Sequence, residues 1–268
     1  KHPGTCSMRI IISLIFNCLL LTSTTNGQVR SKTILGFFSH PDDENMIGHV
    51  LAKYARLGNK VYIIIATDGK DGTRVTNIPA GDSLGEIRQL ESICACEKLG
   101  INPPIFLHIN RLDTKYGVRP YLNGRLKFLN DLKTTIQELQ PDILITFGPD
   151  GEYGHSEHII TGATVIDLLL REGWVDKYPL CLPIDKKGDV EEGDGNSYSD
   201  EQYINIAISF SEEDEMKSFE AAKCYVTQFK KEEIDRLIHD ESADKTNIKY
   251  FRRFNISKGI KNEFDFKD

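Results

Sequence analysis

The chain has 268 residues, of which 40% are hydrophobic and 27% charged, a balance typical of a globular protein and not of a disordered or fibrous one. Its formal net charge of -7 at pH 7 and its pI near 5.6 argue against a nucleic-acid backbone as partner. A small polar molecule is the more natural ligand.

The first 27 residues have the pattern of a signal peptide and are set apart from the fold. Met8 and Arg9 precede an apolar run over residues 10–21, which is shorter than the ~20 residues needed to cross a bilayer. We therefore predict an exported protein, periplasmic, secreted or lumenal, with one domain over residues 28–268 and no stable membrane span. An uncleaved anchor is the alternative.

The first part of the mature chain has the pattern of a strand, a helix and a second strand. Residues 33–38 and 61–66 are continuous apolar runs, which are typical of buried parallel strands. Between them, residues 45–57 place apolar side chains at helical spacing, and Gly58 follows as a helix C-cap would. This unit predicts the beginning of an α/β sheet.

The alternation of strands and helices continues after a Gly-, Asp- and Thr-rich loop over residues 70–85. The pattern predicts, in order, a helix over 86–99, a strand over 105–109, a helix over 122–139, a strand over 142–147, a helix over 159–170, a strand over 203–210 and a helix over 212–229. Such alternation predicts a Rossmann-like three-layer α/β fold, with a mostly parallel central sheet and helices on both faces. Residues 245–268 have no assignable pattern.

Two polar clusters follow two of these strands. If the strand order is 3-2-1-4-5, the strands over 33–38 and 142–147 are neighbours at the point where the order reverses and a ligand crevice opens. The clusters are His40-Pro41-Asp42-Asp43-Glu44 and Gly154-His155-Ser156-Glu157-His158. We therefore expect both clusters to contribute to a single site.

The first cluster can supply a metal ligand pair and a base. Pro41 suits the first turn of a helix, so His40 and Asp43 can converge on one ion from one side of that turn. Asp42 would then point about 100° away and be free to act as general base. The adjacent aspartates could instead serve as helix caps and N-terminal charge.

In the second cluster, His155 and His158 have the same three-residue spacing, and either could complete the ligand set. Two imidazoles and one carboxylate leave open positions for water and substrate, which is the pattern of a catalytic zinc site. The remaining histidine could hold or donate a proton near a developing oxyanion.

Together with Arg88, Glu91, Ala95 and Leu99-Gly100, these clusters resemble the LmbE/PIG-L family of metal-dependent N-deacetylases over about residues 34–170. The resemblance implies Zn²⁺ as cofactor, with Fe²⁺ as the other candidate, and an N-acetylglucosamine-type sugar or glycoconjugate as the substrate that releases acetate. By position it implies these roles: metal ligands His40, Asp43 and His158, general base Asp42, acid or oxyanion-stabilising residue His155, and substrate contacts Arg88 and Asp113.

The second motif departs from the family's usual HPDH, because Ser156 and Glu157 replace Pro and Asp. The longer carboxylate of Glu157 is expected to alter the orientation and pKa of His155 while activity is retained. Arg88 could instead pair with a glutamate of its own helix.

Two other functions are compatible with the same residues: hydrolysis of another small amide, and exported carbohydrate binding without turnover. Asp42 argues against the second, because binding requires the metal ligands but not the base. The oligomeric state is left open. A disulfide is possible among the cysteines of the mature chain, although Cys94 and Cys96 face different directions on a predicted helix and are expected to be buried thiols.

Overall fold

A mixed β-sheet forms the centre of the fold in the computed structural model, which describes residues 1, 30–187 and 197–260. Its strands are β1 (Thr33–Phe38), β2 (Lys60–Thr67), β3 (Ile105–Ile109), β4 (Ile143–Thr146), β5 (Leu180–Lys186), β7 (Ile206–Ser209) and β8 (Ile248–Arg253), with the short β6 (Tyr198–Ser199) beside β5. The order across the sheet is β3-β2-β1-β4-β5-β8-β7.

This order confirms the predicted neighbours at the reversal point. β1 pairs parallel with β2 on one side and with β4 on the other, where Ile34 lies opposite Ile143 and Phe37 opposite Thr146. The parallel arrangement continues to β5, and β8 and β7 then add two antiparallel strands. The sheet is therefore mostly parallel, as predicted, and the ends of β1 and β4 open at the same edge.

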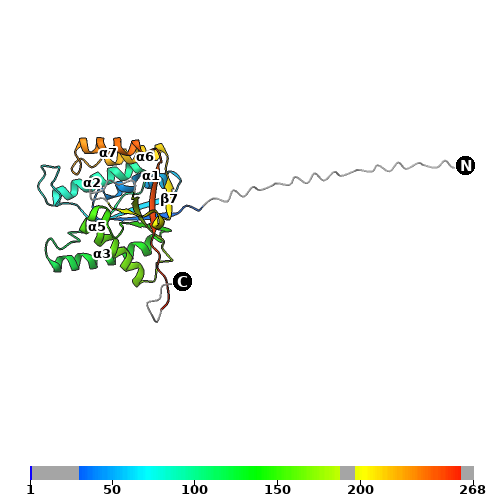
Figure 1. The fold of residues 1–268 in the computed structure, drawn as a ribbon, viewed down its shortest axis with the longest axis horizontal. Coiled ribbons are helices and arrows are strands. Elements are labelled where there is room, and N and C mark those ends of the chain that lie inside the picture. Colours follow the sequence, from blue (N-terminus) through cyan, green and yellow to red (C-terminus); the bar gives the residue numbers. More distant parts are fainter. Residues whose placement is uncertain (2–29, 188–196, 261–268) are drawn as a thin grey trace. The chain divides into compact units, whose positions relative to one another are not determined.

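Helices cover both faces of the sheet (Figure 1). One face carries α1 (Gly48–Arg56), α2 (Asp82–Leu99), α6 (Glu212–Ala222) and α7 (Lys231–Ala243), and the other carries α3 (Val118–Leu139) and α5 (Ser156–Arg171). Short turns of helix lie at η1 (Asp43–Ile47), α4 (Gly151–Gly154) and η2 (Glu201–Tyr203). The three-layer fold predicted from the alternation is confirmed.

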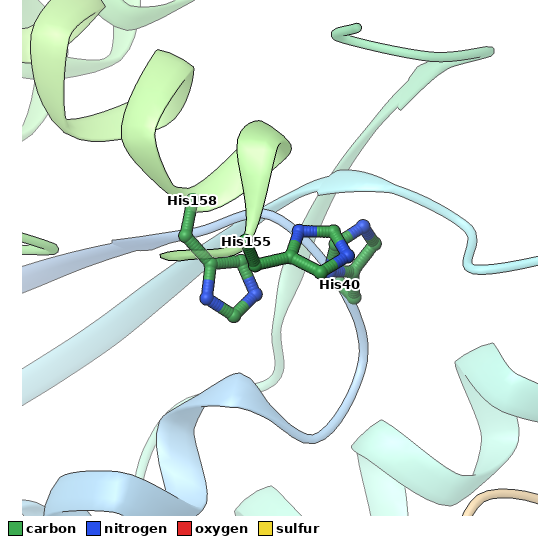
Figure 2. A group of neighbouring side chains, drawn as sticks. All are labelled: His40, His155 and His158. Carbon is green, nitrogen blue, oxygen red and sulfur yellow. The ribbon is translucent and has the colours of Figure 1, made fainter. Parts of the chain in front are cut away.

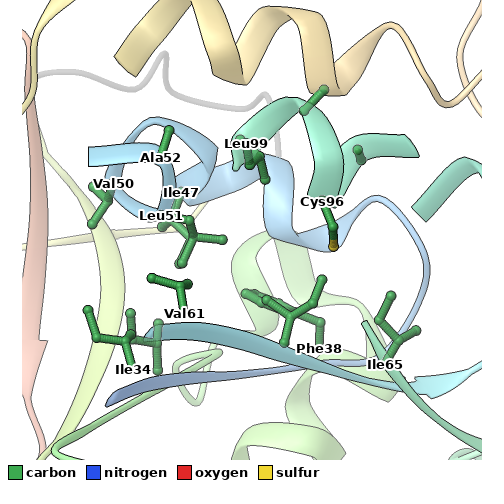
Figure 3. Close-up of a cluster of buried hydrophobic side chains, with 14 of the residues drawn as sticks. Ile34, Phe38, Ile47, Val50, Leu51, Ala52, Val61, Ile65, Cys96 and Leu99 are labelled. Carbon is green, nitrogen blue, oxygen red and sulfur yellow. The ribbon is translucent and has the colours of Figure 1, made fainter. Parts of the chain in front are cut away.

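The apolar runs of the strands are buried because helices pack against both faces of the sheet. One core cluster lies between the sheet and helices α1 and α2, where Ile34 and Phe38 face Leu51 and Leu99 (Figure 3). A second cluster, with Phe37 and Leu144 among its members, fills the space under α3 and α5. The two cores hold β1 and β4 rigidly from both sides.

The C-terminal part differs from the prediction. α6 ends at Ala222 and not at Phe229, and α7, β5 and β8 had not been predicted. After Ala222 the backbone continues in turns, in which the Cys224 N–H donates to the Ala221 carbonyl. The N–H and hydroxyl of Thr227 then donate to Glu91 of α2. β5 contains Pro183, a residue that weakens the sequence pattern of a strand.

Cys94 on α2 forms a disulfide with Cys224, just beyond the end of α6, across a sequence separation of 130 residues. The expectation of a buried thiol at Cys94 was therefore wrong, because the residues after α6 pack beside α2. Cys96 is a buried thiol, as expected.

Contacts divide the chain into a unit over residues 1–30 and a unit over residues 31–268. The predicted signal peptide falls in the first unit and, apart from Lys1, lies outside the described residues, as do residues 261–268 of the tail that has no assignable pattern. Among the helices that the structure describes, none has the length and hydropathy needed to cross a bilayer.

Candidate metal and catalytic site

Three histidines from the two clusters meet at the edge where β1 and β4 end (Figure 2). His40 follows β1, and His155 and His158 stand at the beginning of α5. Each ring offers a nitrogen within 4.8 Å of the nitrogens offered by the other two. The strand order thus brings together residues more than one hundred positions apart in the sequence, as predicted.

Asp43 lies between His40 and His158. Its Oδ2 accepts hydrogen bonds from the backbone N–H groups of Ser39, at 2.9 Å, and His40, at 2.8 Å. Its Oδ1 lies 3.2 Å from His158 Nε2, and its Oδ2 lies 3.6 Å from His40 Nδ1. Burial opposes ionisation, but the two histidines outweigh it and lower the pKa of Asp43 well below its usual range.

His40 is held from its other edge by Glu157. The distance from His40 Nε2 to Glu157 Oε2 is 2.8 Å, and Glu157 Oε1 accepts a hydrogen bond from the backbone N–H of Leu112 at 2.6 Å. Burial lowers the pKa of His40, but Asp43 and Glu157 outweigh it and raise the value to about 10. With Nε2 at Glu157, His40 Nδ1 is the nitrogen that faces Asp43.

This pairing corrects the expectation that the Glu157 carboxylate orients His155. The carboxylate contacts His40, and the hydrogen bond from Glu157 to His155 comes from its backbone N–H, which donates to His155 Nδ1 at 3.3 Å. The Glu157 carboxylate acts on the pKa of His155 through its charge, which raises it. Glu157 lies in the first turn of α5, where its buried side chain is directed toward His40 and Leu112 from other parts of the chain.

His158 is 1% exposed, and its ring stacks on Phe147 at a centroid distance of 4.0 Å. Among the described residues, neither ring nitrogen has a partner in hydrogen-bond geometry, although Asp43 Oδ1 lies 3.2 Å from Nε2 and Glu152 Oε2 lies 3.4 Å from Nδ1. A buried imidazole without hydrogen bonds costs free energy unless another group satisfies it. The donor set of His40, Asp43 and His158 therefore fits a divalent metal ion.

Asp42 has a left-handed backbone conformation, with φ of 99°. It precedes η1 as its N-cap residue, so its separation from Asp43 arises from this conformation and not from a helical turn of 100°. Burial and the charge of Asp43 raise the pKa of Asp42 well above its usual range. A bound cation would act in the opposite direction and favour the carboxylate form.

His155 is the N-cap residue of α5, where its Nδ1 accepts the backbone N–H of Glu157. Burial, together with His40 and His158, lowers its pKa to about 4. With Nδ1 occupied by the helix, Nε2 is the nitrogen that remains available to a ligand in the cleft.

His40, Asp42, Asp43 and His155 line a cleft of about 730 Å³, which is also lined by Glu152 and Tyr153. Sequence reasoning missed both residues, although they directly precede the second cluster. The Tyr153 ring lies edge-on to His158 with centroids 5.4 Å apart, and Glu152 has an unusual positive φ of 70°. The sequence offered one indication of their role, because Glu152 and Tyr153 stand immediately before Gly154 and His155.

Arg88 is 5% exposed, and its guanidinium donates to the carbonyls of Gly69 and Gly72 and to Thr227. The structure thus gives it protein partners at the wall of the cleft, and among the described residues no glutamate lies in ion-pair contact with it. Contact with substrate hydroxyls stays a prediction.

Asp113 accepts two hydrogen bonds from Arg111, at 2.6 and 2.7 Å, and lines a separate cavity of about 290 Å³. It touches the second cluster through Ser156, whose hydroxyl lies 3.4 Å from Asp113 Oδ2. Asp113 is therefore not among the residues that line the larger cleft, and its contact with substrate stays a prediction.

The model of the PIG-L family, described as GlcNAc-PI de-N-acetylase, matches residues 35–169. The chain is 32% identical over 146 residues to the 1D-myo-inositol 2-acetamido-2-deoxy-alpha-D-glucopyranoside deacetylase of Rhodococcus erythropolis, covering 48% of this chain and 50% of that protein. To the Corynebacterium glutamicum protein of the same name it is 27% identical over 244 residues, covering 82% and 81%. It thus spans about half of the first relative and most of the second.

Among solved structures, the fold is similar to that of N,N'-diacetylchitobiose deacetylase from Pyrococcus horikoshii. The TM-score is 0.62 at 20% sequence identity, with 84% of each chain covered. This likeness concerns the fold.

Proposed function

Because this chain belongs to the PIG-L family, we propose that it is a divalent-metal-dependent hydrolase that removes the N-acetyl group from an N-acetylglucosamine-type amino sugar or glycoconjugate. One observation carries this proposal. Two imidazoles and a carboxylate, from His40, His158 and Asp43, converge from the ends of two neighbouring strands, and the carboxyl of Asp42 lies in the same cleft.

We assign Zn²⁺ to the site, with His40 Nδ1, Asp43 and His158 Nε2 as its ligands. Imidazole nitrogens and a single carboxylate are donors that zinc prefers, and Fe²⁺ is the other ion that commonly takes this set. When bound, such an ion polarises a carbonyl and makes water a stronger acid.

The side chains around the ion would carry the proton transfers of amide hydrolysis. Asp42 accepts a proton from water as the water oxygen attacks the acetamide carbonyl carbon. His155, whose Nε2 is free of the helix, stabilises the oxygen on which negative charge develops. Breakage of the C–N bond then needs a proton on the leaving nitrogen, which Asp42 can return. The products are acetate and the free amine.

The substrate class follows from the relatives and from the cleft. The names of the Rhodococcus and Pyrococcus proteins each specify an N-acetylated sugar. The cleft volume, about 730 Å³, falls within the ~300–1,000 Å³ range of small-molecule sites. Its lining includes charged and amide side chains such as Lys70, Asn110 and Gln228, which suit a hydroxyl-rich molecule.

Export of the protein is a further part of the proposal. The apolar run over residues 10–21 supports it, and so does the Cys94–Cys224 disulfide, since disulfides persist mainly in oxidising compartments.

The test is acetate release from a panel of N-acetylglucosamine derivatives, before and after removal of metal with a chelator and after addition of Zn²⁺ or Fe²⁺. We expect release that is lost with the chelator and restored by the ion. Tight binding of these sugars with no release from the metal-loaded protein would favour the carbohydrate-binding alternative. Hydrolysis of another amide would support the proposed reaction and assign a different substrate to the protein.

A further inference from the structure

The residues just after α6 reach across to the first cluster. Tyr225, which is 1% exposed, donates a hydrogen bond from its hydroxyl to the buried carboxyl of Glu44. Gln228 donates from its side-chain Nε2 to the backbone carbonyl of Pro41. Residues 224–228, hereafter the 224–228 segment, therefore contact the His40–Glu44 cluster on both sides of Asp42 and Asp43.

The 224–228 segment is itself held firmly. The Cys94–Cys224 disulfide fixes its beginning to α2. Glu91 of α2 accepts hydrogen bonds from the N–H and the hydroxyl of Thr227, both at 2.8 Å. Near its end, Arg74 donates to the Gln228 carbonyl at 3.0 Å. A side chain projecting from this segment thus starts from a fixed backbone position.

The partner of Gln228 has a direct geometric relation to Asp42. The Pro41 carbonyl belongs to the peptide plane that precedes Asp42, and the orientation of that plane helps to set φ of Asp42. The Asp42 carbonyl, on the other side, accepts the N–H of Asn45 at 3.0 Å. Both carbonyls that flank the Asp42 Cα are therefore engaged, and the residue between them has a φ of 99°.

A positive φ is uncommon for a residue other than glycine, and it persists where the surroundings stabilise it. We propose that Gln228 is a positioning residue, which holds Asp42 in the left-handed conformation and thereby aims its carboxyl at the centre of the site. This inference rests on the proposed function, in which Asp42 is the general base, and it gives a task to a residue outside the span that the family model matches.

Gln228 also lines the cleft, so a direct contact with substrate is the competing explanation. The two differ in kinetics. A lost substrate contact raises KM and leaves kcat nearly unchanged, whereas a misplaced base lowers kcat with little effect on KM. They also differ in coupling, because a residue that acts through Asp42 has no further effect once Asp42 is replaced.

The experiment compares Gln228→Met, which keeps the length of the side chain but lacks the donor, with the exposed control Gln137→Met on α3. Metal content, kcat and KM are measured in the wild-type and Asp42→Asn backgrounds. We expect Gln228→Met to lower kcat about tenfold or more, with KM and bound metal unchanged, and to add nothing in the Asp42→Asn background. Gln228→Glu, of the same shape, serves if the methionine variant is poorly folded.

A rise in KM alone, or equal losses in both backgrounds, would overturn the inference. Crystal structures of the wild type and of Gln228→Met give a reading that does not need turnover: we expect Asp42 to leave the left-handed region in the variant. If the wild type releases no acetate, the proposed function fails, while this structural comparison still decides whether Gln228 positions Asp42. An unchanged Asp42 conformation would refute the positioning role in either case.

Discussion

Glu157 Oε2 lies 2.8 Å from His40 Nε2, at the edge of the imidazole away from the nitrogen that faces Asp43. A carboxylate in this position fixes the orientation of a ligand histidine and makes it a better donor. We expect Glu157→Gln to weaken metal binding roughly 10- to 100-fold. Competition with a chelating dye measures the affinity. Glu97→Gln, exposed on α2, is the matched control, and equal affinities in the two variants would refute the role given to Glu157.

Asp42 and Asp43 are adjacent, but their replacements should fail in different ways. Loss of a general base typically costs roughly 100- to 10,000-fold in rate, so Asp42→Asn should lower kcat by that factor with bound metal retained. Asp43→Asn should instead lose the bound metal, and its turnover should fall as a consequence. Metal analysis and acetate release on the same samples separate the two effects. Unchanged turnover in Asp42→Asn would remove Asp42 from the mechanism.

Gly162 allows α5 to approach the end of β4 closely. A Cβ atom at this position would lie 2.5 Å from the backbone carbonyl oxygen of Phe147, which has little freedom to move. We expect Gly162→Ala to displace α5 and to lower the free energy of unfolding by roughly 1–3 kcal/mol, as overpacking does. Denaturant unfolding measures this change. Ala163→Ser, at the exposed neighbouring position, should stay close to wild type.

The Cys94–Cys224 disulfide joins residues separated by 130 positions. A cross-link of this kind restricts the unfolded chain, so the double variant Cys94→Ser/Cys224→Ser should lose about 2–4 kcal/mol of unfolding free energy. Chemical denaturation with and without a reductant checks this expectation. The reductant should destabilise the wild type and leave the double variant unaffected. Insensitivity of both proteins would mean that the bond contributes little to stability.

His49 is 7% exposed, and the centroid of its ring lies 4.0 Å from that of Phe210. In the part of the chain that the structure describes, its Nε2 has no hydrogen-bond partner. Burial, reinforced by Lys249, lowers its pKa from 6.5 to about 3. The unfolded chain therefore takes up a proton at a higher pH than the folded protein does. The contribution of neutral His49 to the free energy of unfolding is complete above pH 6.5 and is lost as the pH falls toward 3.

This contribution should appear as a slope of up to about 1.4 kcal/mol per pH unit in the free energy of unfolding. His49→Phe removes the titrating group, so the slope between pH 6 and 4 should become shallower. His239→Gln, at an exposed position on α7, provides the control and should keep the wild-type slope. Identical slopes in all three proteins would show that His49 does not govern this pH range.

The reaction centre could be predicted from the sequence because its residues lie in short clusters beside strong strand patterns. The apolar runs at β1 and β4 are buried on both faces, which makes them easy to recognise, and the parallel fold then places the ends of β1 and β4 together. His40, Asp43 and His158 converge as expected for this reason.

The remaining contacts depend on tertiary packing that no local pattern reports. The sequence does not indicate that Glu157 faces His40 and not His155, because the direction of a side chain in the first helical turn depends on what packs beside it. Likewise, the residues after α6 do not continue the helix, and among them Thr227 bonds to Glu91, a residue 136 positions away. The disulfide between Cys94 and Cys224 could not be deduced for the same reason.

The residues that line the cleft come from two parts of the chain, one before the end of α5 and one after it. The residues proposed for metal binding and proton transfer all precede the end of α5 at Arg171, whereas Asp185, Phe229, Leu237, Glu241 and Lys249 contribute lining from β5 and the segments that follow. Hybrid proteins that exchange the portion after α5 between relatives, with Gln228 retained, should therefore shift in sugar preference and keep the chemistry proposed for the recipient. Selectivity in this architecture can diverge while the reaction stays the same.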